Sequence, residues 1–168
     1  MKKLETASYV AVICSCALLT YVLLSQYVFR THLDRNDPKL RQPAVGRTLQ
    51  LTNVSWANAN RSLVLAISSH CGYCIRSTAF YQKLSDKRRS QHAATKLIAV
   101  MSEDPSSATS FLERNGVLVD QVATAPLSAL GVDATPTVLL VDNNGKVIGE
   151  WIGLLNPSAE NQVMSQLD

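Results

Sequence analysis

An uncharged apolar run near the N-terminus is the feature that most constrains how this chain can fold. Residues 6–29 contain no charged side chain, and seventeen of the 21 residues 9–29 are apolar. A helix of about 21 residues rises about 31 Å, which matches a hydrocarbon core of about 30 Å. We therefore predict one transmembrane helix over residues 9–29, preceded by a short tail of residues 1–8.

A cleaved signal peptide is the alternative interpretation of this run. The run is longer than the usual apolar core of a signal peptide, about 7–15 residues, and no clear small-residue cleavage site follows it. Cys14 and Cys16 lie within the run, about 200° apart around a helix, so they cannot pair with each other. We interpret both as small apolar helix residues.

The rest of the chain has the composition of one soluble domain. Of 168 residues, 46% are hydrophobic and 17% are charged, and the net charge is +3. These proportions exclude a disordered chain, a collagen and a polytopic membrane protein. The basic residues form no stripe, so we expect no nucleic-acid partner. A polar stretch over residues 30–43 predicts a linker, and residues 44–168 predict one globular domain.

Alternating short apolar runs and capped helical segments predict an α/β domain with a mixed central sheet and helices on both faces. The expected strands are residues 48–54, 62–67, 96–101, 117–122, 137–141 and 146–151. The expected helices are residues 72–89, 105–115 and 125–130, with a last one that opens at residues 156–157. The run at 62–67 is apolar throughout, as in strands buried on both faces.

Two cysteines stand where this buried strand ends and the next helix begins, in the sequence Cys71-Gly72-Tyr73-Cys74. The first turn of a helix has unpaired N–H groups and a partial positive charge, which stabilise a thiolate on Cys71. That thiolate is the nucleophile in disulfide exchange. Cys74 lies almost one helical turn further on, so it can attack a mixed disulfide on Cys71. We predict Cys71 as the nucleophile and Cys74 as the resolving cysteine.

The residues beside the pair extend this prediction, and two other uses of the pair remain open. A protonated His70 would stabilise the thiolate, and Tyr73 would shape the surface that meets a partner. A zinc site would need two further ligands, and the other cysteines lie in the predicted membrane helix. An inert structural disulfide would close a loop too short to stabilise the fold much. We expect no metal ion and no cofactor.

Three segments of the domain carry a family resemblance. They are the strand that runs into the cysteine pair, residues 130–142 with the triplet Thr135-Pro136-Thr137, and residues 145–153 with Trp151. Together they resemble the thioredoxin superfamily, and most of all its membrane-tethered, TlpA/ResA-like thiol–disulfide oxidoreductases. The resemblance implies a cis bond before Pro136, contact of Pro136 with the cysteines, and backbone groups of Thr135 that bind a substrate peptide.

The chain departs from the pattern of that superfamily in three places. His70 replaces the usual Trp before the first cysteine, and Leu65 replaces the buried carboxylate of thioredoxins. The dipeptide between the cysteines lacks the proline of cytosolic thioredoxins. Proton transfer to Cys74 then needs another group or water. These departures leave the redox potential and the direction of electron flow open.

The resemblance implies a membrane-tethered enzyme that exchanges disulfides with protein partners outside the cytoplasm. A reductase is the favoured role, in cytochrome c maturation or in disulfide repair, with a membrane protein as electron donor. The basic residues around the predicted span slightly favour a cytoplasmic domain. Because a tether retains a small protein outside the cytoplasm, we nevertheless expect a single-pass anchor in the cell membrane with the domain on the periplasmic side.

Two further functions compete with disulfide exchange. Peroxiredoxins share the fold, and Ser68-x-x-Cys71 matches part of their active-site pattern, although Val64 stands where that pattern has proline. A thiol peroxidase is therefore the first alternative. The second is a tethered redox sensor or metal carrier that binds a soft ion through both thiolates. Copper carriers of this fold have a three-residue spacer between their cysteines, which counts against that alternative.

Overall fold

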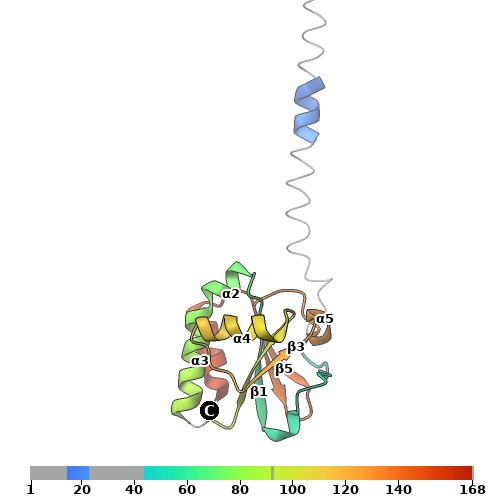
Figure 1. Cartoon of the computed structure of the whole chain (residues 1–168). Coiled ribbons are helices and arrows are strands. Elements are labelled where there is room, and N and C mark those ends of the chain that lie inside the picture. The colour runs from blue at the N-terminus through green and yellow to red at the C-terminus, as the bar shows by residue number, and fades with distance from the viewer. Residues whose placement is uncertain (1–14, 23–43, 92, 168) are drawn as a thin grey trace, which may run out of the picture. The chain divides into compact units, whose positions relative to one another are not determined.

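The chain divides into two units, Met1–Arg41 and Gln42–Asp168. The computed structural model describes residues 15–22, 44–91 and 93–167 (Figure 1). Residues 15–22 are helical, and no helix among the described residues is both long and apolar enough to cross a membrane. The predicted tail, the predicted linker and most of the predicted span over 9–29 lie outside the described residues.

A mixed sheet of five strands forms the centre of the second unit, in the order β3-β2-β1-β4-β5. The strands are β1 (Arg61–Ala66), β2 (Lys96–Met101), β3 (Gln121–Thr124), β4 (Thr137–Asp142) and β5 (Val147–Ile152). β1 runs parallel to β2 and antiparallel to β4. The strand that leads to the cysteine pair is therefore the middle strand, which explains why its sequence is apolar throughout.

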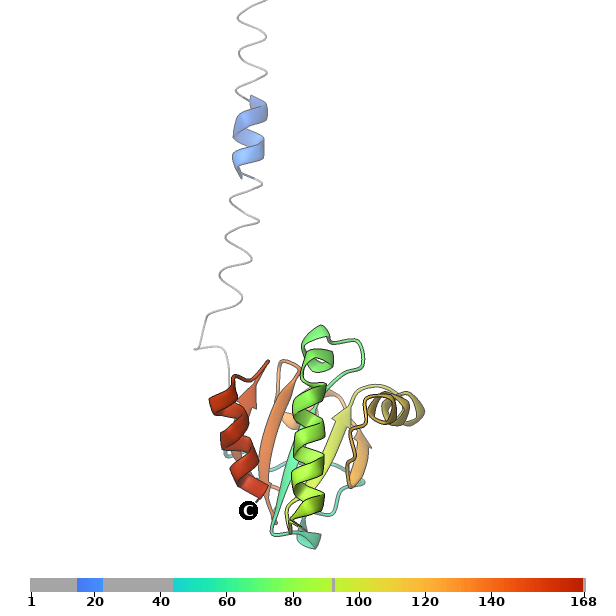
Figure 2. The ribbon, with the colours of Figure 1, turned by 90° about the vertical axis from the view of Figure 1, so that its left-hand side faces the viewer.

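Helices and loops cover both faces of this sheet (Figures 1 and 2). The helices of this unit are α2 (Gly72–Arg76), α3 (Thr78–Ser90), α4 (Pro105–Arg114), α5 (Leu127–Leu130) and α6 (Pro157–Met164), with 3-10 turns at Trp56–Asn58 and Ser165–Leu167. Leu63 and Leu65 of β1 pack with side chains of α3, α4 and α6. Val64 and Ala66 face the other way, toward α5 and residues 44–51. The predicted mixed sheet with helices on both faces is confirmed.

Four predicted elements differ in detail from the structure. Residues 48–54 form no strand but one isolated bridge between Thr48 and Lys146. Leu49 and Leu51 are buried because the loop to which they belong packs on the sheet. The helix predicted over 72–89 is divided at Ser77, which ends α2 and begins α3. The strand predicted over 117–122 begins only at Gln121. The turn predicted over 125–130 starts after Pro126, which is its N-cap.

Candidate active site

Cys71 is the N-cap of α2, so its sulfur lies at the unpaired N–H groups of the first helical turn. Its backbone is extended, with φ −89° and ψ 114°, and this turns the side chain back over the helix. The sulfur accepts a hydrogen bond from the N–H of Cys74 at 3.3 Å, and it donates to the carbonyl oxygen of Thr135 at 3.3 Å. The predicted place of Cys71 at the start of a helix is confirmed, and its role as nucleophile stays a prediction.

The two cysteines differ in exposure. Cys71 is partly exposed, Cys74 is completely buried in the larger hydrophobic cluster, and both are free thiols. An attacking sulfur must reach a partner, whereas a resolving sulfur needs only to reach Cys71. The exposure of each side chain therefore suits the role predicted for it.

The surroundings shift the pKa values of the two thiols in opposite directions. Burial acts to raise the pKa of Cys71, but hydrogen bonds from the side chains of Cys74 and Thr135 and from backbone N–H groups outweigh it, so the pKa of Cys71 is lowered. Burial, reinforced by the hydrogen bond with Cys71, raises the pKa of Cys74 to about 12. At neutral pH, Cys74 therefore keeps its proton and Cys71 is the thiol that ionises more readily.

The loop that leads into β4 completes the site. The bond between Thr135 and Pro136 is cis, as the resemblance implied. Pro136 is buried, and its carbonyl oxygen accepts a hydrogen bond from the N–H of Gly153 at 2.7 Å. This bond ties the loop to the end of β5, while the carbonyl oxygen of Thr135 faces Cys71. The structure thus brings Thr135 against the cysteine pair, and its role in binding a peptide stays a prediction.

Two predicted residues lie at the surface beside Cys71. Tyr73 is 54% exposed, and the guanidinium of Arg76 lies 5.5 Å from the centre of its ring. The side chain of His70 is exposed, and its Nδ1 lies 3.0 Å from Ser69 Oγ and 3.5 Å from Glu103 Oε1. Both side chains are accessible to a partner, and their roles toward a partner stay predictions.

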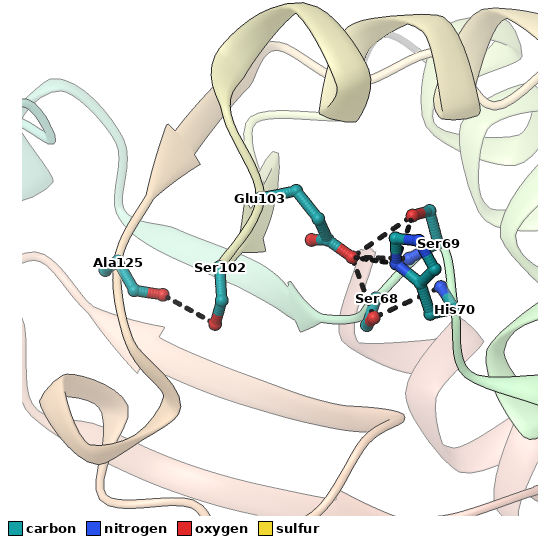
Figure 3. Close-up of polar contacts among 6 residues, drawn as sticks. All are labelled: Ser68, Ser69, His70, Ser102, Glu103 and Ala125. Atoms are coloured by element: carbon teal, nitrogen blue, oxygen red, sulfur yellow. Dashed lines mark hydrogen bonds and ion pairs between the residues drawn. The ribbon is translucent and has the colours of Figure 1, made fainter.

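Two residues near the cysteine pair, Glu103 and Tyr81, were not predicted as site residues from the sequence. Glu103 follows β2, and its carboxylate accepts hydrogen bonds from Ser68 and Ser69 (Figure 3). The signal for Glu103 was available, because parallel neighbouring strands end at the same edge of a sheet. Tyr81 is buried in the same cluster as Cys74, and its hydroxyl has no hydrogen-bond partner within the described part of the chain. Burial and the nearby Cys74 raise the pKa of this hydroxyl.

Leu65 places an apolar side chain at the position where thioredoxins have a buried carboxylate. Leu65 is fully buried in the cluster that contains Cys74, so β1 offers this thiol no proton acceptor at that place. Among residues 15–22, 44–91 and 93–167, no three His, Cys, Asp or Glu side chains lie close enough together to hold a metal ion.

The sequence of this domain was compared with models of protein families and with curated proteins. The sequence model of the family described as Redoxin matches residues 35–165. No curated protein sequence matches the chain.

Several solved structures share the fold. The thioredoxin domain of a thiol-disulfide oxidoreductase from Bacteroides vulgatus is 14% identical with a TM-score of 0.58, over 76% of this chain and 100% of that chain. StoA from Bacillus subtilis is 17% identical with a TM-score of 0.54, over 75% and 100%. A thiol-disulfide isomerase from Corynebacterium glutamicum is 15% identical with a TM-score of 0.58, over 73% and 96%. At these identities the likeness establishes the thioredoxin-like fold.

Proposed function

The chain belongs to the Redoxin family as a thiol:disulfide oxidoreductase, and we propose that it reduces disulfides of extracytoplasmic proteins from a membrane tether. One observation carries the division of labour between the cysteines. Cys71 is partly exposed with a lowered pKa, whereas Cys74 is buried with a raised pKa. Only Cys71 combines access to a partner with a stabilised thiolate, so Cys71 attacks and Cys74 resolves.

The exchange proceeds in two steps. The Cys71 thiolate attacks one sulfur of the partner's disulfide, which forms a mixed disulfide and releases the partner's other sulfur as a thiolate that takes up a proton. Cys74 then gives up its proton to water or a nearby group and attacks Cys71 Sγ. This breaks the mixed disulfide and releases the partner's second thiol. The partner gains two electrons, and the Cys71–Cys74 pair loses them as it forms a disulfide.

The first step needs a partner held beside Cys71. The carbonyl oxygen of Thr135 faces the sulfur, and Tyr73 and Ile75 expose apolar surface on α2. An extended peptide with an apolar side chain near its cysteine suits this surface, because backbone groups align the peptide and the apolar side chain covers Tyr73. A membrane protein that donates two electrons would then restore both thiols.

The peroxidase alternative has less support than disulfide exchange. A peroxidase of the peroxiredoxin type would direct the hydroxyl of Ser68 toward a peroxide at Cys71. Here that hydroxyl donates to Glu103 Oε1 at 2.7 Å and accepts from the N–H of His70. Peroxide consumption that persists at full rate in Cys74→Ser would overturn the exchange mechanism, since a peroxidase of that kind does not need Cys74.

A trapping experiment tests the division of labour. Cys74→Ser is expected to accumulate mixed disulfides between Cys71 and its partners, because the resolving thiol is absent. Cys71→Ser is the matched control, and it should trap no partner. Equal trapping by the two variants would contradict the assigned roles.

A redox titration tests the direction of electron flow. Potentials in this fold range from about −270 mV for reductants to about −120 mV for oxidants. We expect the Cys71–Cys74 pair of the wild-type chain near the reducing end. A potential near the oxidising end would refute the reductase role and leave the exchange chemistry itself intact.

The tether is tested on isolated membranes and on spheroplasts, whose outer envelope has been opened so that protease reaches the outer face of the cytoplasmic membrane. We expect the full chain to stay with the membrane after washing at high pH, and the domain to be digested by protease added outside the cytoplasmic membrane. A chain released by the wash has no anchor. A domain protected from the protease lies in the cytoplasm, which would refute the extracytoplasmic site of action.

A further inference from the structure

Glu103 reaches from the end of β2 to the turn that precedes the nucleophile, residues 68–70 (Figure 3). Its Oε1 accepts hydrogen bonds from Ser68 Oγ at 2.7 Å, from the N–H of Ser69 at 2.8 Å and from Ser69 Oγ at 3.2 Å. The same oxygen lies 3.5 Å from His70 Nδ1. One carboxylate oxygen therefore contacts three successive residues directly before Cys71.

Hydrogen bonds within the turn connect Glu103 to the backbone of Cys71. The N–H of Cys71 donates to the carbonyl oxygen of Ser68 at 3.2 Å. The hydroxyl of Ser68, which donates to Glu103, also accepts from the N–H of His70 at 3.2 Å. Ser68 thus joins Glu103 to the backbone of the nucleophile, and the backbone of Cys71 determines where its sulfur lies relative to the N–H of Cys74.

The carboxylate of Glu103 is mostly buried, and only one of its two oxygens is hydrogen-bonded to a described residue. Only 13% of the Glu103 side chain is exposed, and its second oxygen, Oε2, is buried with no hydrogen-bond partner among the residues that the structure describes. A buried charge is costly unless it is fully hydrogen-bonded, and unpartnered buried groups concentrate at functional sites.

The carboxylate remains charged at neutral pH. Burial acts to raise the pKa of Glu103, but hydrogen bonds from Ser68 and Ser69 outweigh it, so the pKa is lowered. Among the residues that the structure describes, the titratable side chain that forms an ion pair with this carboxylate is His70, which comes from the turn before α2. Asp104 turns toward its own helix, where it accepts from the N–H groups of Ser106 and Ser107. On the other side, Ser102 Oγ donates to the carbonyl oxygen of Ala125, which carries no charge.

We propose that Glu103 is a positioning residue for the nucleophile: its carboxylate fixes the turn of residues 68–70, and this holds the sulfur of Cys71 opposite the N–H of Cys74. The proposal rests on the proposed function, in which Cys71 is the attacking group. It assigns Glu103 no contact with the partner and no proton to transfer.

The proposal predicts the direction in which the pKa of Cys71 changes when Glu103 is removed. If Glu103 acts by holding the turn, its removal loosens Cys71 from the donors that stabilise the thiolate, and the pKa of Cys71 rises. If Glu103 acted only as a nearby negative charge, its removal would favour the thiolate, and the pKa of Cys71 would fall. The two mechanisms are therefore distinguished by the direction of one measured shift.

The test measures alkylation of Cys71 across the pH range in which thiols ionise. The full chain is reduced and given a short pulse of iodoacetamide, and the label on Cys71 is quantified by mass spectrometry from fragment ions that distinguish Cys71 from Cys74 in the same peptide. The variants are Glu103→Ala, which removes the acceptor, and Glu103→Gln, which keeps an acceptor oxygen without the charge. Glu113→Gln, at an exposed position of α4, is the matched control.

For Glu103→Ala we expect the midpoint of alkylation to rise by at least about half a pH unit, which lowers the rate at neutral pH about threefold. Glu103→Gln should shift the midpoint less in the same direction, because a neutral oxygen is a weaker acceptor. Glu113→Gln should match the wild type. A loss of stability alone would not move this midpoint, and the melting temperature of each variant is recorded beside it.

An unchanged or lowered midpoint in a folded Glu103→Ala chain would overturn the proposal. If Glu103→Ala does not fold, Glu103→Gln decides the question by the same sign, since it preserves the size of the side chain. Alkylation needs neither a partner nor turnover. A wild-type chain that fails to reduce disulfides would therefore refute the proposed function while this test remained readable.

Discussion

Removal of the Cys74 thiol should make Cys71 a weaker acid. Burial works against ionisation of Cys71, and the strongest influence in the opposite direction is the hydrogen bond from the side chain of Cys74. In Cys74→Ala that donor is lost, while the N–H at 3.3 Å from Cys71 Sγ remains. A hydrogen bond to a charged group contributes about 1.5–3 kcal/mol, but a thiol is a weak donor and Cys71 is partly exposed, so we take about 1 kcal/mol.

That free energy corresponds to a rise of about 0.7 pH units in the pKa of Cys71, or about a fivefold smaller thiolate fraction at neutral pH. The assay is the pH dependence of alkylation of the peptide that contains Cys71, in chains kept reduced. Cys74→Ser is the matched control, because its hydroxyl still donates a hydrogen bond, and its midpoint should lie closer to the wild-type value.

A midpoint for Cys74→Ala at or below that of the wild type would refute this reasoning. It would mean that the helix N-terminus and the backbone N–H groups stabilise the thiolate without help from the second cysteine. A fall in rate without a change in midpoint would equally contradict it, since the predicted effect acts through the fraction of thiolate.

Four further predictions concern the stability of the reduced chain. Because the pKa of Cys74 is raised to about 12 on folding, its contribution to stability is complete below the pKa of a free thiol, near 9, and is lost as the pH rises toward 12. The free energy of unfolding should therefore fall above pH 9, by up to about 1.4 kcal/mol per pH unit, and Cys74→Ala should reduce this slope. Gly145→Ala should destabilise the domain by about 1–3 kcal/mol in chemical denaturation, because φ is +80° and the new Cβ would lie 2.8 Å from Trp56. Gly72→Ala has open space around it, so it should change stability by less than about 0.5 kcal/mol. Leu65→Asp, which restores a carboxylate at the position thioredoxins use, should cost more than about 3 kcal/mol, because the fully buried charge would have no partner; thermal unfolding close to that of the wild type would contradict this.

Local signals account for the elements that were predicted well. Asp104 before Pro105 predicted a helix start, and in the structure its carboxylate accepts from two N–H groups of the first turn of α4. Asn156 caps α6 in the same way. Such caps are formed within a few residues of chain, so the sequence alone reveals them.

The errors arose where burial, rather than backbone pairing, produced the pattern. Leu49 and Leu51 alternate with polar residues as a strand would, yet they belong to a loop that packs on the sheet. Ser77 divides one helical pattern into two helices: it is the C-cap of α2 and the N-cap of α3, with ψ 0° in place of the helical value of about −42°. Period alone does not distinguish these cases from a regular strand or a continuous helix.

Local sequence is enough to predict the strand segments of the central sheet, the position of the cysteine pair at the start of a helix, and the residues that resemble the loop around Pro136. Each of these depends on neighbours along the chain. The groups that surround Cys71, by contrast, depend on how distant segments pack together. Glu103 follows β2 and Thr135 precedes β4, and both meet the cysteine turn because β1, β2 and β4 lie side by side in one sheet. The pKa values of the two thiols depend on these contacts and on burial, neither of which can be seen in the spacing of the cysteines.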